Sequence, residues 1–518
     1  MLINLQLYNV KSEKAFYTKS TFFTQQDKDY FLHMVERGQT VYSIAKMYNV
    51  SLDAVYELNP GSEGGIQAGS ELKIPQESGS YFYHTIQSKE TLYSVSRMYQ
   101  MKGEDILDVN QGLSIETFTV GRVIRIPTNR VTTPMEGTNE ECNKKITNEL
   151  LNVSSKVKND IKSVKTALLI PFGLKEGTTP QNAAGNRMVE YYAGFLLALK
   201  DLKKKGISVD LQVYDIGSGV DLLSTILKKT SMQDVDLIIG GLSDKQIKLI
   251  AAFSNEKEIP YVIPFTSKTD EPLNYYTVYQ ISTPQSYLYS KASAAFCNKY
   301  KDANIIFYIS ESSKSKMDFI KTVQKDLTVK KIPYKVVKDE NLSSEIQNAL
   351  SSTKNNVFVP SDDALETLLN LITPLKSVLE TIPQTAVSLF GYPAWQIYAA
   401  KYSADFFQLN VAFYSIFYAN PTSSKVKSFY NNYIQWYSRE MINTFPKYGI
   451  LGYDMGMFFI QLLDKYGTSY DVNVNKPNYS NVQTDFYFER VNNWGGFINT
   501  NIYLIEFNSD LAITSNRY

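Results

Sequence analysis

The chain has 518 residues, more than one hydrophobic core usually supports (roughly 250 to 300 residues), so we expect several domains. Hydrophobic residues make up 43% and charged residues 20%, which excludes a disordered chain, and the formal net charge of +1 argues against nucleic acid as a partner. Only 2 His and 2 Cys accompany 38 Tyr and 27 Phe, a balance that favours binding surfaces over metal or nucleophile chemistry.

The N-terminal segment, residues 1–29, lacks the basic tip, apolar stretch and small-residue cleavage site with which an exported protein should begin. We expect the start of this sequence to be altered and the export signal to be missing from it. A longer upstream reading frame that encodes an apolar stretch would support this expectation. No run of about 18 apolar residues occurs in the sequence, so no ordinary transmembrane segment is expected.

An internal repeat follows, because residues 30–75 recur at 81–127. Identical residues at a constant offset of 51 positions are Thr40 and Thr91, Tyr42 and Tyr93, Met47 and Met98, and Asn59 and Asn110. In the first copy the pattern predicts a strand at 33–35, a helix capped by Thr40, a short helix after Ser51 and a closing strand at 71–74. Each copy is therefore expected to be a βααβ unit.

The motifs of the repeat resemble the LysM family. These are a Gly-x-Thr-hydrophobic-Tyr-Ser-Ile-Ala run starting at Gly38, a Leu-Asn-Pro-Gly turn at 58–61 and a closing Gly-x-x-Leu-x-Ile-Pro strand at 69–75. The resemblance implies modules at 30–76 and 80–128 that bind N-acetylglucosamine-containing glycans such as peptidoglycan. It places the groove between two loops, at Gly38, Gln39, Thr40, Val41, Asn59, Pro60 and Gly61 in the first copy and at Lys89, Glu90, Thr91, Leu92, Asn110 and Gln111 in the second.

Other roles remain open for several of these positions. The second copy departs from the family by having Lys89 in place of the glycine and by lacking the Pro-Gly pair after Asn110. Thr40 and Thr91 could serve only as helix caps. The two histidines, His33 and His84, occupy the same slot of the opening strand, and we expect them to be packing residues rather than ligands or acids. The tyrosines at helical spacing are Tyr42, Tyr48, Tyr93 and Tyr99, and core packing is their alternative to stacking on sugars.

Residues 129–164 are polar and are expected to form a linker that leads into a charged helix, before a large domain at 165–518. Short β-branched runs alternate there with amphipathic helices, which predicts parallel sheets covered on both faces. The first series places strands at 166–171, 210–214, 235–239 and 261–263, with helices at 191–202, 222–229 and 245–253. The second series places strands at 304–309, 334–337, 356–359, 386–389 and 410–413. The fold class is thus multidomain, with two small βααβ modules and a two-lobed α/β domain.

The large domain resembles the type I periplasmic binding proteins, the Leu/Ile/Val-binding group, through the order of several short pieces. These pieces begin at Ala193, Tyr214, Ile239, Ile259, Tyr448 and Gly495. Ligands of such sheets bind beyond the carboxyl ends of the strands. The resemblance implies a cleft lined by Phe172, Ser218, Ser243, Thr266 and Ser267 from the first lobe and by Ser310, Ser361 and Tyr392 from the second.

Within this cleft, Ser243 and Thr266 stand where amino-acid-binding members hold the ligand through hydroxyl groups. The sequence offers no clear Arg or Asp anchor for an α-amino acid, so a working cleft and a repurposed one both stay open. Cys142 and Cys297 could form one disulfide or none.

For function we expect a non-catalytic bacterial envelope protein that needs no cofactor and no metal. Its partners would be peptidoglycan strands and, at the large domain, a small molecule or an envelope protein, with the domain acting as sensor or scaffold. One alternative is the substrate-binding component of an amino-acid-type transporter tethered to the wall. The other is a wall-targeted hydrolase: zinc or Cys-His chemistry needs histidines that residues 165–518 lack, but a carboxylate-pair glycosidase stays open.

Overall fold

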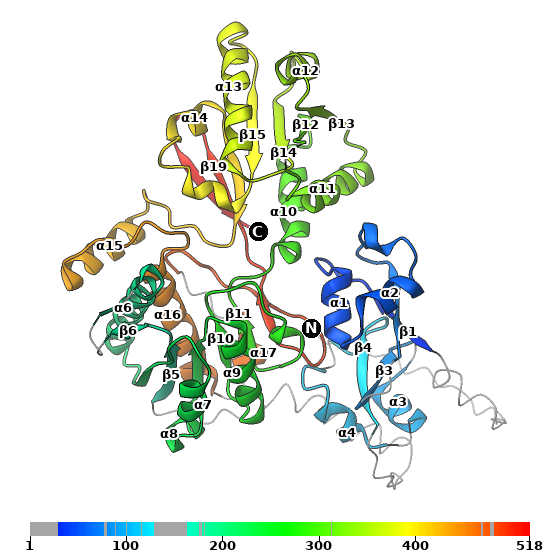
Figure 1. Ribbon diagram of the computed structural model, residues 1–518, viewed down its shortest axis with the longest axis vertical. Helices are drawn as coiled ribbons and strands as arrows, with labels where there is room; N and C mark the ends of the chain where they lie inside the picture. Colours follow the sequence, from blue (N-terminus) through cyan, green and yellow to red (C-terminus); the bar gives the residue numbers. More distant parts are fainter. Residues whose placement is uncertain are drawn as a thin grey trace, which may run out of the picture.

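The computed structural model consists of two small N-terminal modules beside a large two-lobed domain (Figure 1). It describes residues 29–76, 80–88, 90–99, 101–114, 117–128, 163–175, 179–180, 182–311, 313–467, 470–476 and 481–518. Almost all of the expected N-terminal segment and linker, together with Cys142 and Lys89, lie outside these residues. No helix in these ranges is both long enough and apolar enough to cross a membrane.

The first module has the predicted βααβ order. Its elements are β1 (Tyr30–Met34), α1 (Val41–Tyr48), α2 (Leu52–Leu58), the short 3₁₀ helix η1 (Ser62–Gly64) and β2 (Glu71–Pro75). Strand β1 begins earlier than the predicted 33–35, because its antiparallel pairing with β2 starts at Tyr30 opposite Pro75. The predicted Thr40 cap of α1 is confirmed, and Ser51, after which the second helix was predicted, caps α2 through its side-chain oxygen.

The second module repeats this order with β3 (Tyr81–Thr85), α3 (Leu92–Met98), α4 (Gly103–Asp108) and β4 (Val123–Pro127). Thr91 caps α3 through the same reciprocal pair of bonds with Ser94 that Thr40 makes with Ser43. Equivalent core residues of the two modules are fully buried, namely Ile44 and Val95, Val55 and Ile106, and Ile74 and Ile126. The duplication therefore preserves one small core.

The first lobe is built on a seven-stranded sheet of order β17-β18-β11-β10-β9-β5-β8. Its strands are β5 (Val164–Ile170), β8 (Val209–Asp215), β9 (Leu237–Gly240), β10 (Tyr261–Ile263), β11 (Val278–Gln280), β17 (Phe488–Arg490) and β18 (Phe497–Asn499). All neighbours pair in parallel except β17 with β18. The lobe also holds the β6–β7 hairpin (Leu174–Lys175, Thr179–Pro180), α6 (Ala183–Lys204), α7 (Asp221–Leu227), α8 (Thr230–Gln233), α9 (Asp244–Glu256), η2 (Glu271–Leu273), α16 (Tyr448–Tyr466) and α17 (Tyr470–Asn473).

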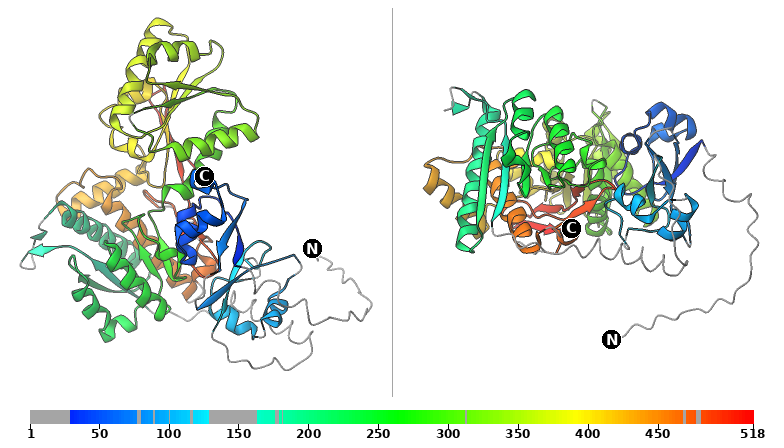
Figure 2. Two further views of the ribbon diagram at one scale, coloured as in Figure 1. Left: turned by 45° about the vertical axis from the view of Figure 1, so that its right-hand side comes forward. Right: turned by 90° about the horizontal axis from the view of Figure 1, so that it is seen from below.

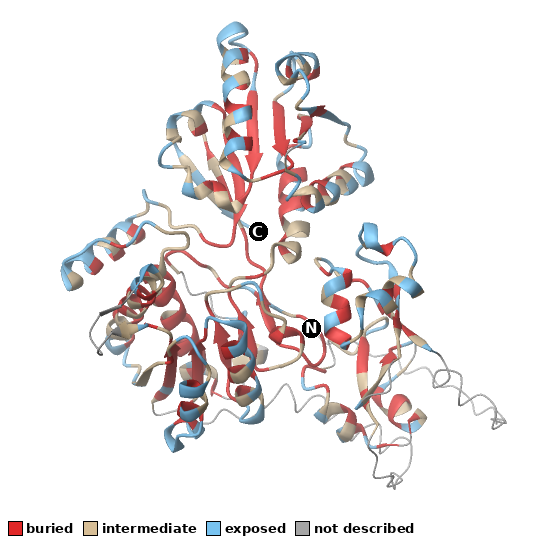
Figure 3. Ribbon diagram, viewed as in Figure 1, coloured by how far each residue is buried: buried red, intermediate tan, exposed pale blue. Residues whose placement is uncertain are grey.

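The second lobe has a seven-stranded sheet of order β13-β12-β14-β15-β16-β19-β20. Its strands are β12 (Asn304–Ile309), β13 (Tyr334–Lys338), β14 (Asn356–Pro360), β15 (Val387–Gly391), β16 (Ala412–Ser415), β19 (Tyr503–Phe507) and β20 (Ile513–Arg517). The helices of this lobe are α10 (Gln285–Lys299), α11 (Met317–Val329), α12 (Leu342–Ala349), α13 (Leu365–Thr381), η3 (Pro393–Ile397) and α14 (Ser403–Gln408). The strands from β13 to β16 are parallel, and the sheets form the buried interior of each lobe (Figure 3). The two-lobed α/β prediction is confirmed.

The chain crosses between the lobes more often than the sequence suggested. It leaves the first lobe after β11, returns after β16 through α15 (Ser424–Tyr437) and α16, and leaves again after β18. Helix α16 packs so closely on α6 that a Cβ at Gly194 would lie 1.7 Å from the carbonyl oxygen of Gly449. Both lobes are thus completed by residues from the C-terminal part of the chain.

Candidate functional site

In the first module, the loop that opens α1 is held by His33 and Gln39. His33 Nδ1 lies 2.7 Å from the Tyr48 hydroxyl, and His33 Nε2 lies 2.7 Å from Gln39 Oε1, which also accepts from the backbone N–H of Glu36 at 2.8 Å. Burial lowers the pKa of His33 to about 4, so the imidazole is neutral at neutral pH. It donates from Nε2 and accepts at Nδ1. His33 is therefore a packing residue, as predicted. The side-chain oxygen of Gln39, Oε1, already accepts two hydrogen bonds inside the loop.

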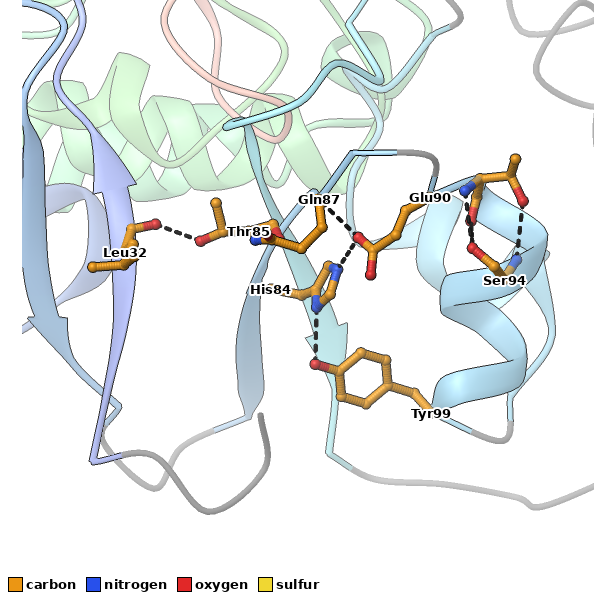
Figure 4. Close-up of polar contacts among 8 residues, drawn as sticks. Leu32, His84, Thr85, Gln87, Glu90, Ser94 and Tyr99 are labelled. Carbon is orange, nitrogen blue, oxygen red and sulfur yellow. Dashed lines mark hydrogen bonds and ion pairs between the residues drawn. The ribbon is translucent and has the colours of Figure 1, made fainter. Parts of the chain in front are cut away.

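We call this chain of hydrogen bonds from Tyr48 through His33 to Gln39 the His bracket. The second module repeats it with the carboxylate of Glu90 in place of the Gln39 amide (Figure 4). His84 Nδ1 lies 3.1 Å from the Tyr99 hydroxyl and Nε2 lies 2.7 Å from Glu90 Oε2, which accepts from the Gln87 N–H at 2.7 Å. Partial burial raises the pKa of Glu90, but the hydrogen bonds from His84 and Gln87 outweigh it and hold that pKa below its ordinary value. The two histidines thus play one structural role.

A second bracket closes the loop between the second helix and the last strand. Asn59 donates to the carbonyls of Val55 and Lys73, both at 2.7 Å, and accepts from the Lys73 N–H at 2.9 Å. Asn110 makes the same three bonds to Ile106 and Arg125, at 2.7, 2.7 and 2.8 Å. Because these bonds use both ends of each carboxamide, the two asparagines fix the loop rather than present a free side chain.

The remaining predicted groove residues differ in how far they are exposed to solvent. Thr40, Pro60, Gly61, Thr91 and Gln111 are exposed, Gly38 is half-buried, and Val41 and Leu92 are buried beneath the first turns of α1 and α3. The exposed positions belong to the two predicted loops of each module, and Lys89 lies outside the described residues. Loop backbone flanked by rigid helices is thus what the modules can offer an N-acetyl group, which needs a donor, an acceptor and a small apolar wall.

Both modules pack on the first lobe, where they lie side by side in all views (Figures 1 and 2). Trp494, in the turn between β17 and β18, is only 4% exposed, and its ring centroid lies 5.9 Å from that of Tyr48 and 5.8 Å from that of Tyr83. The Arg125 guanidinium lies 4.4 Å from the same indole. This indole joins residues of both modules and of the first lobe in one hydrophobic cluster.

The two modules contact the large domain through different loops. In the first, a Cβ at Gly38 would lie 2.3 Å from the Cα of Tyr287, so the loop before α1 rests on the first turn of α10. In the second, a Cβ at Gly112 would lie 2.6 Å from Arg490 Cδ, and the Gly112 N–H donates to the Asn493 carbonyl at 2.7 Å. The loop at Gly61 of the first module and the loop at Thr91 of the second therefore stay clear of these two contacts.

A cavity of about 530 Å³ lies between α1 and the first lobe. Thr40, Tyr42 and Lys46 line it from the module, and Ser267, Lys268 and Asp270 line it from the lobe. It therefore unites Thr40, predicted for the glycan groove, with Ser267, predicted for the interlobe cleft. We call this cavity the interdomain pocket.

The predicted cleft residues of the two lobes differ in exposure to solvent. In the first lobe Ser218, Ser243 and Ser267 are exposed, Thr266 is half-buried and Phe172 is 6% exposed. In the second lobe Ser310, Ser361 and Tyr392 are at most 2% exposed. Ser361 Oγ accepts from the Ser310 N–H at 2.9 Å, and the Tyr392 hydroxyl donates to the Pro360 carbonyl at 2.5 Å. These three residues hold loops together instead of facing solvent.

Comparison with known proteins supports the modules directly. The family model described as LysM domain matches residues 33–75 and 84–127. The candidate sporulation-specific glycosylase YdhD of Bacillus subtilis strain 168 is 29% identical over 97 residues, which cover 19% of this chain and only 22% of that relative. The N-terminal part of the chain is therefore a pair of LysM domains.

The large domain is similar to solved substrate-binding proteins of ABC transporters. An ABC transporter substrate-binding protein from Desulfitobacterium hafniense in complex with Leu has 12% identity and a TM-score of 0.42, covering 68% of this chain and 100% of that one. The branched-chain amino acid protein LivJ of Streptococcus pneumoniae in complex with isoleucine has 13% identity and a TM-score of 0.38, covering 69% and 100%. The fold of the large domain is defined by its own two seven-stranded sheets and their strand order.

Within the described ranges, no group of three or more His, Cys, Asp or Glu side chains is placed to hold a metal ion. Cys297 is 1% exposed, and burial raises the pKa of its thiol to about 11, which disfavours the thiolate that a nucleophile needs.

Proposed function

We propose that this chain is a non-catalytic protein of a bacterial cell envelope that binds N-acetylglucosamine-containing wall glycan through its two LysM domains. The observation that carries the proposal is the pair of matches to the LysM model, on modules whose loops are fixed by the same His and Asn brackets. Loops held in place before the ligand arrives lose little conformational entropy on binding.

Two modules on one scaffold favour binding to a polymer. Each LysM groove is expected to be shallow and weak, and a second site held nearby raises the overall affinity through effective concentration. Here the modules are tied to each other, because the Thr85 hydroxyl donates to the Leu32 carbonyl. Both are also hydrogen-bonded to the first lobe, the first through Tyr42 and Asp270 and the second through Gly112 and Asn493. Their spacing is therefore set by packing rather than by a loose linker, which suits the regular repeat of a glycan strand.

For the large domain we propose the role of a sensor or scaffold for envelope machinery, in the periplasm or at the wall. The support is the contact of the first module with Tyr287, which lies just after the first crossing of the chain between the lobes. Because the first module contacts the segment that connects the lobes, binding of this module to the wall would affect the position of one lobe relative to the other. A transport receptor, in contrast, gains nothing from being tethered to its wall.

The test is co-sedimentation of the full chain with purified peptidoglycan sacculi, with an N-acetylglucosamine oligomer as competitor. Pro60→Glu combined with Thr91→Asp places a charge on the loop of each module that stays clear of the large domain, and Asp can still cap α3. This double variant is expected to stay in the supernatant. Gln347→Glu, on the exposed face of α12, is the matched control and should still pellet. A wild-type chain that stays in the supernatant contradicts the proposal.

A further inference from the structure

The interdomain pocket carries charges of both signs on a surface shared by the first module and the first lobe. Lys46 and Lys268 supply the cations, and Asp244 and Asp270 supply the carboxylates. No ion pair is recorded for any of these four side chains among the residues that the structure describes. Their charges are therefore available to a ligand.

The half-exposed ring of Tyr42 stands at the module side of this pocket. Its hydroxyl donates to Asp270 Oδ2 across the two domains at 3.4 Å, and Lys46 Nζ lies 5.6 Å from its ring centroid. Ser267 and Thr269 add hydroxyl groups from the lobe. The pocket thus offers cations, anions, hydroxyls and the aromatic ring of Tyr42 within a volume of about 530 Å³, a size that suits a ligand of several residues.

The pocket adjoins the predicted glycan groove of the first module. Thr40 lines the pocket and also belongs to the loop before α1 that forms one wall of that groove. Glycan bound in the groove would therefore lie next to the pocket that Lys46 and Lys268 line.

We propose that the interdomain pocket binds a short peptide with both free carboxylate and free ammonium groups, attached to the glycan strand that the first module holds. This inference rests on the proposed function and names the part of the wall that the large domain recognises. The lysines pair with the carboxylates of the peptide, and Asp244 and Asp270 pair with its ammonium group.

Charge complementarity selects this chemistry over simpler ligands. A neutral sugar would cover four charged side chains without pairing them, which costs free energy because their hydration is lost. A small anion would meet two carboxylates, and a cation would meet two ammonium groups. A peptide with both charges satisfies all four.

The position of the pocket links this recognition to the lobes. Pro284, Ser286 and Tyr287 also line it, and they belong to the segment that enters the second lobe. A bound peptide therefore contacts the module, the first lobe and the connection between the lobes, and it stabilises the docked arrangement of the module.

The test measures binding of three probes to the full chain by calorimetry: a tetrasaccharide released from sacculi with its peptides, the same tetrasaccharide with the peptides removed, and the free peptide. We expect the peptide-bearing glycan to bind about tenfold more tightly than the stripped glycan, which is a difference of about 1.4 kcal/mol. Lys268→Glu should abolish this preference and leave the affinity for stripped glycan unchanged. Lys228→Glu, an exposed lysine of the first lobe outside the pocket, should preserve it.

The outcomes separate the two proposals. Failure of both glycans to bind overturns the proposed function. Equal binding of the two glycans to the wild-type chain, or a preference that survives in both Lys268→Glu and Lys46→Glu, overturns the pocket alone. Free peptide that binds as tightly as the peptide-bearing glycan contradicts a shared ligand. Lys268→Met, checked for folding by circular dichroism, removes the charge without reversing it and should lose the preference as well.

Discussion

The two LysM domains have nearly the same interior and yet present different sides to the rest of the molecule. The cap of the first helix and the Asn110-type hydrogen bonds are the same in both, and equivalent core positions are buried in both. The first module nevertheless rests on the large domain through Gly38 and the second through Gly112. The glycine equivalent to Gly112 in the first module is Gly61, which is exposed and has nothing within 4 Å of its Cβ direction. Duplication thus preserved how each module folds, while the partner surface decides which loop remains open to a ligand.

The largest loss of stability is expected from removing Trp494, the first-lobe side chain on which both modules pack. Trp494→Ala deletes a buried indole, which should cost roughly 4 kcal/mol of unfolding free energy, and it should raise hydrogen exchange in both docked loops. Trp436→Ala, on α15, is the matched control, because that indole is 56% exposed. It should change stability little. Unchanged exchange in Trp494→Ala would mean that the modules do not depend on this contact.

The Asn brackets allow the two modules to be compared directly. Asn110→Ala removes three hydrogen bonds made by a side chain that is 0% exposed, and should cost roughly 3 kcal/mol of unfolding free energy in urea denaturation. Asn59→Ala removes the same three bonds from a half-buried site, where water can replace some of them, and should cost less. Equal losses of unfolding free energy in the two variants would show that solvent exposure does not control the strength of these hydrogen bonds.

The His brackets should make the first module sensitive to acid. The pKa of His33 is about 4 in the folded state against 6.5 as its ordinary value, so the unfolded state binds more protons between these values. Stability is therefore lost as the pH falls through this window, by about 2 kcal/mol between pH 7 and pH 5.

Gln39→Glu gives the first module the carboxylate that Glu90 supplies in the second. It should raise the pKa of His33 and reduce this loss, as followed by hydrogen exchange of β1 and α1 at the two pH values. An unchanged pH dependence in the variant would contradict the role assigned to the bracket.

The smallest effects concern two glycines with positive φ. Gly38→Ala meets both the strain of φ +86° and the backbone of Tyr287, and should cost about 2 kcal/mol and loosen the docking of the first module. Gly61→Ala meets only the strain of φ +90° and should cost about 1 kcal/mol. Thermal unfolding of the two variants measures the difference, and a larger shift for Gly61→Ala would argue against the contact with α10.

Local sequence patterns predicted the elements well, because the periodicity and caps that form α1 or β10 lie within a few residues. They did not predict the docking through Trp494, since nothing near that residue indicates which distant surface will cover it. An aromatic side chain within the Asn492-Asn493-Trp494-Gly495-Gly496 turn was the available signal. Hydroxyl residues after strands were equally ambiguous: Ser243 is exposed as a helix cap, whereas Ser361 is buried by a neighbouring loop.

Hydrogen exchange of the full chain, with and without an N-acetylglucosamine oligomer, tests whether the LysM pair holds the glycan. We predict protection of the backbone amides in the loops that remain open, at Gly61 in the first module and at Leu92 in the second. Protection confined to the large domain, or absent from both modules, would contradict the claim that the LysM pair holds the glycan.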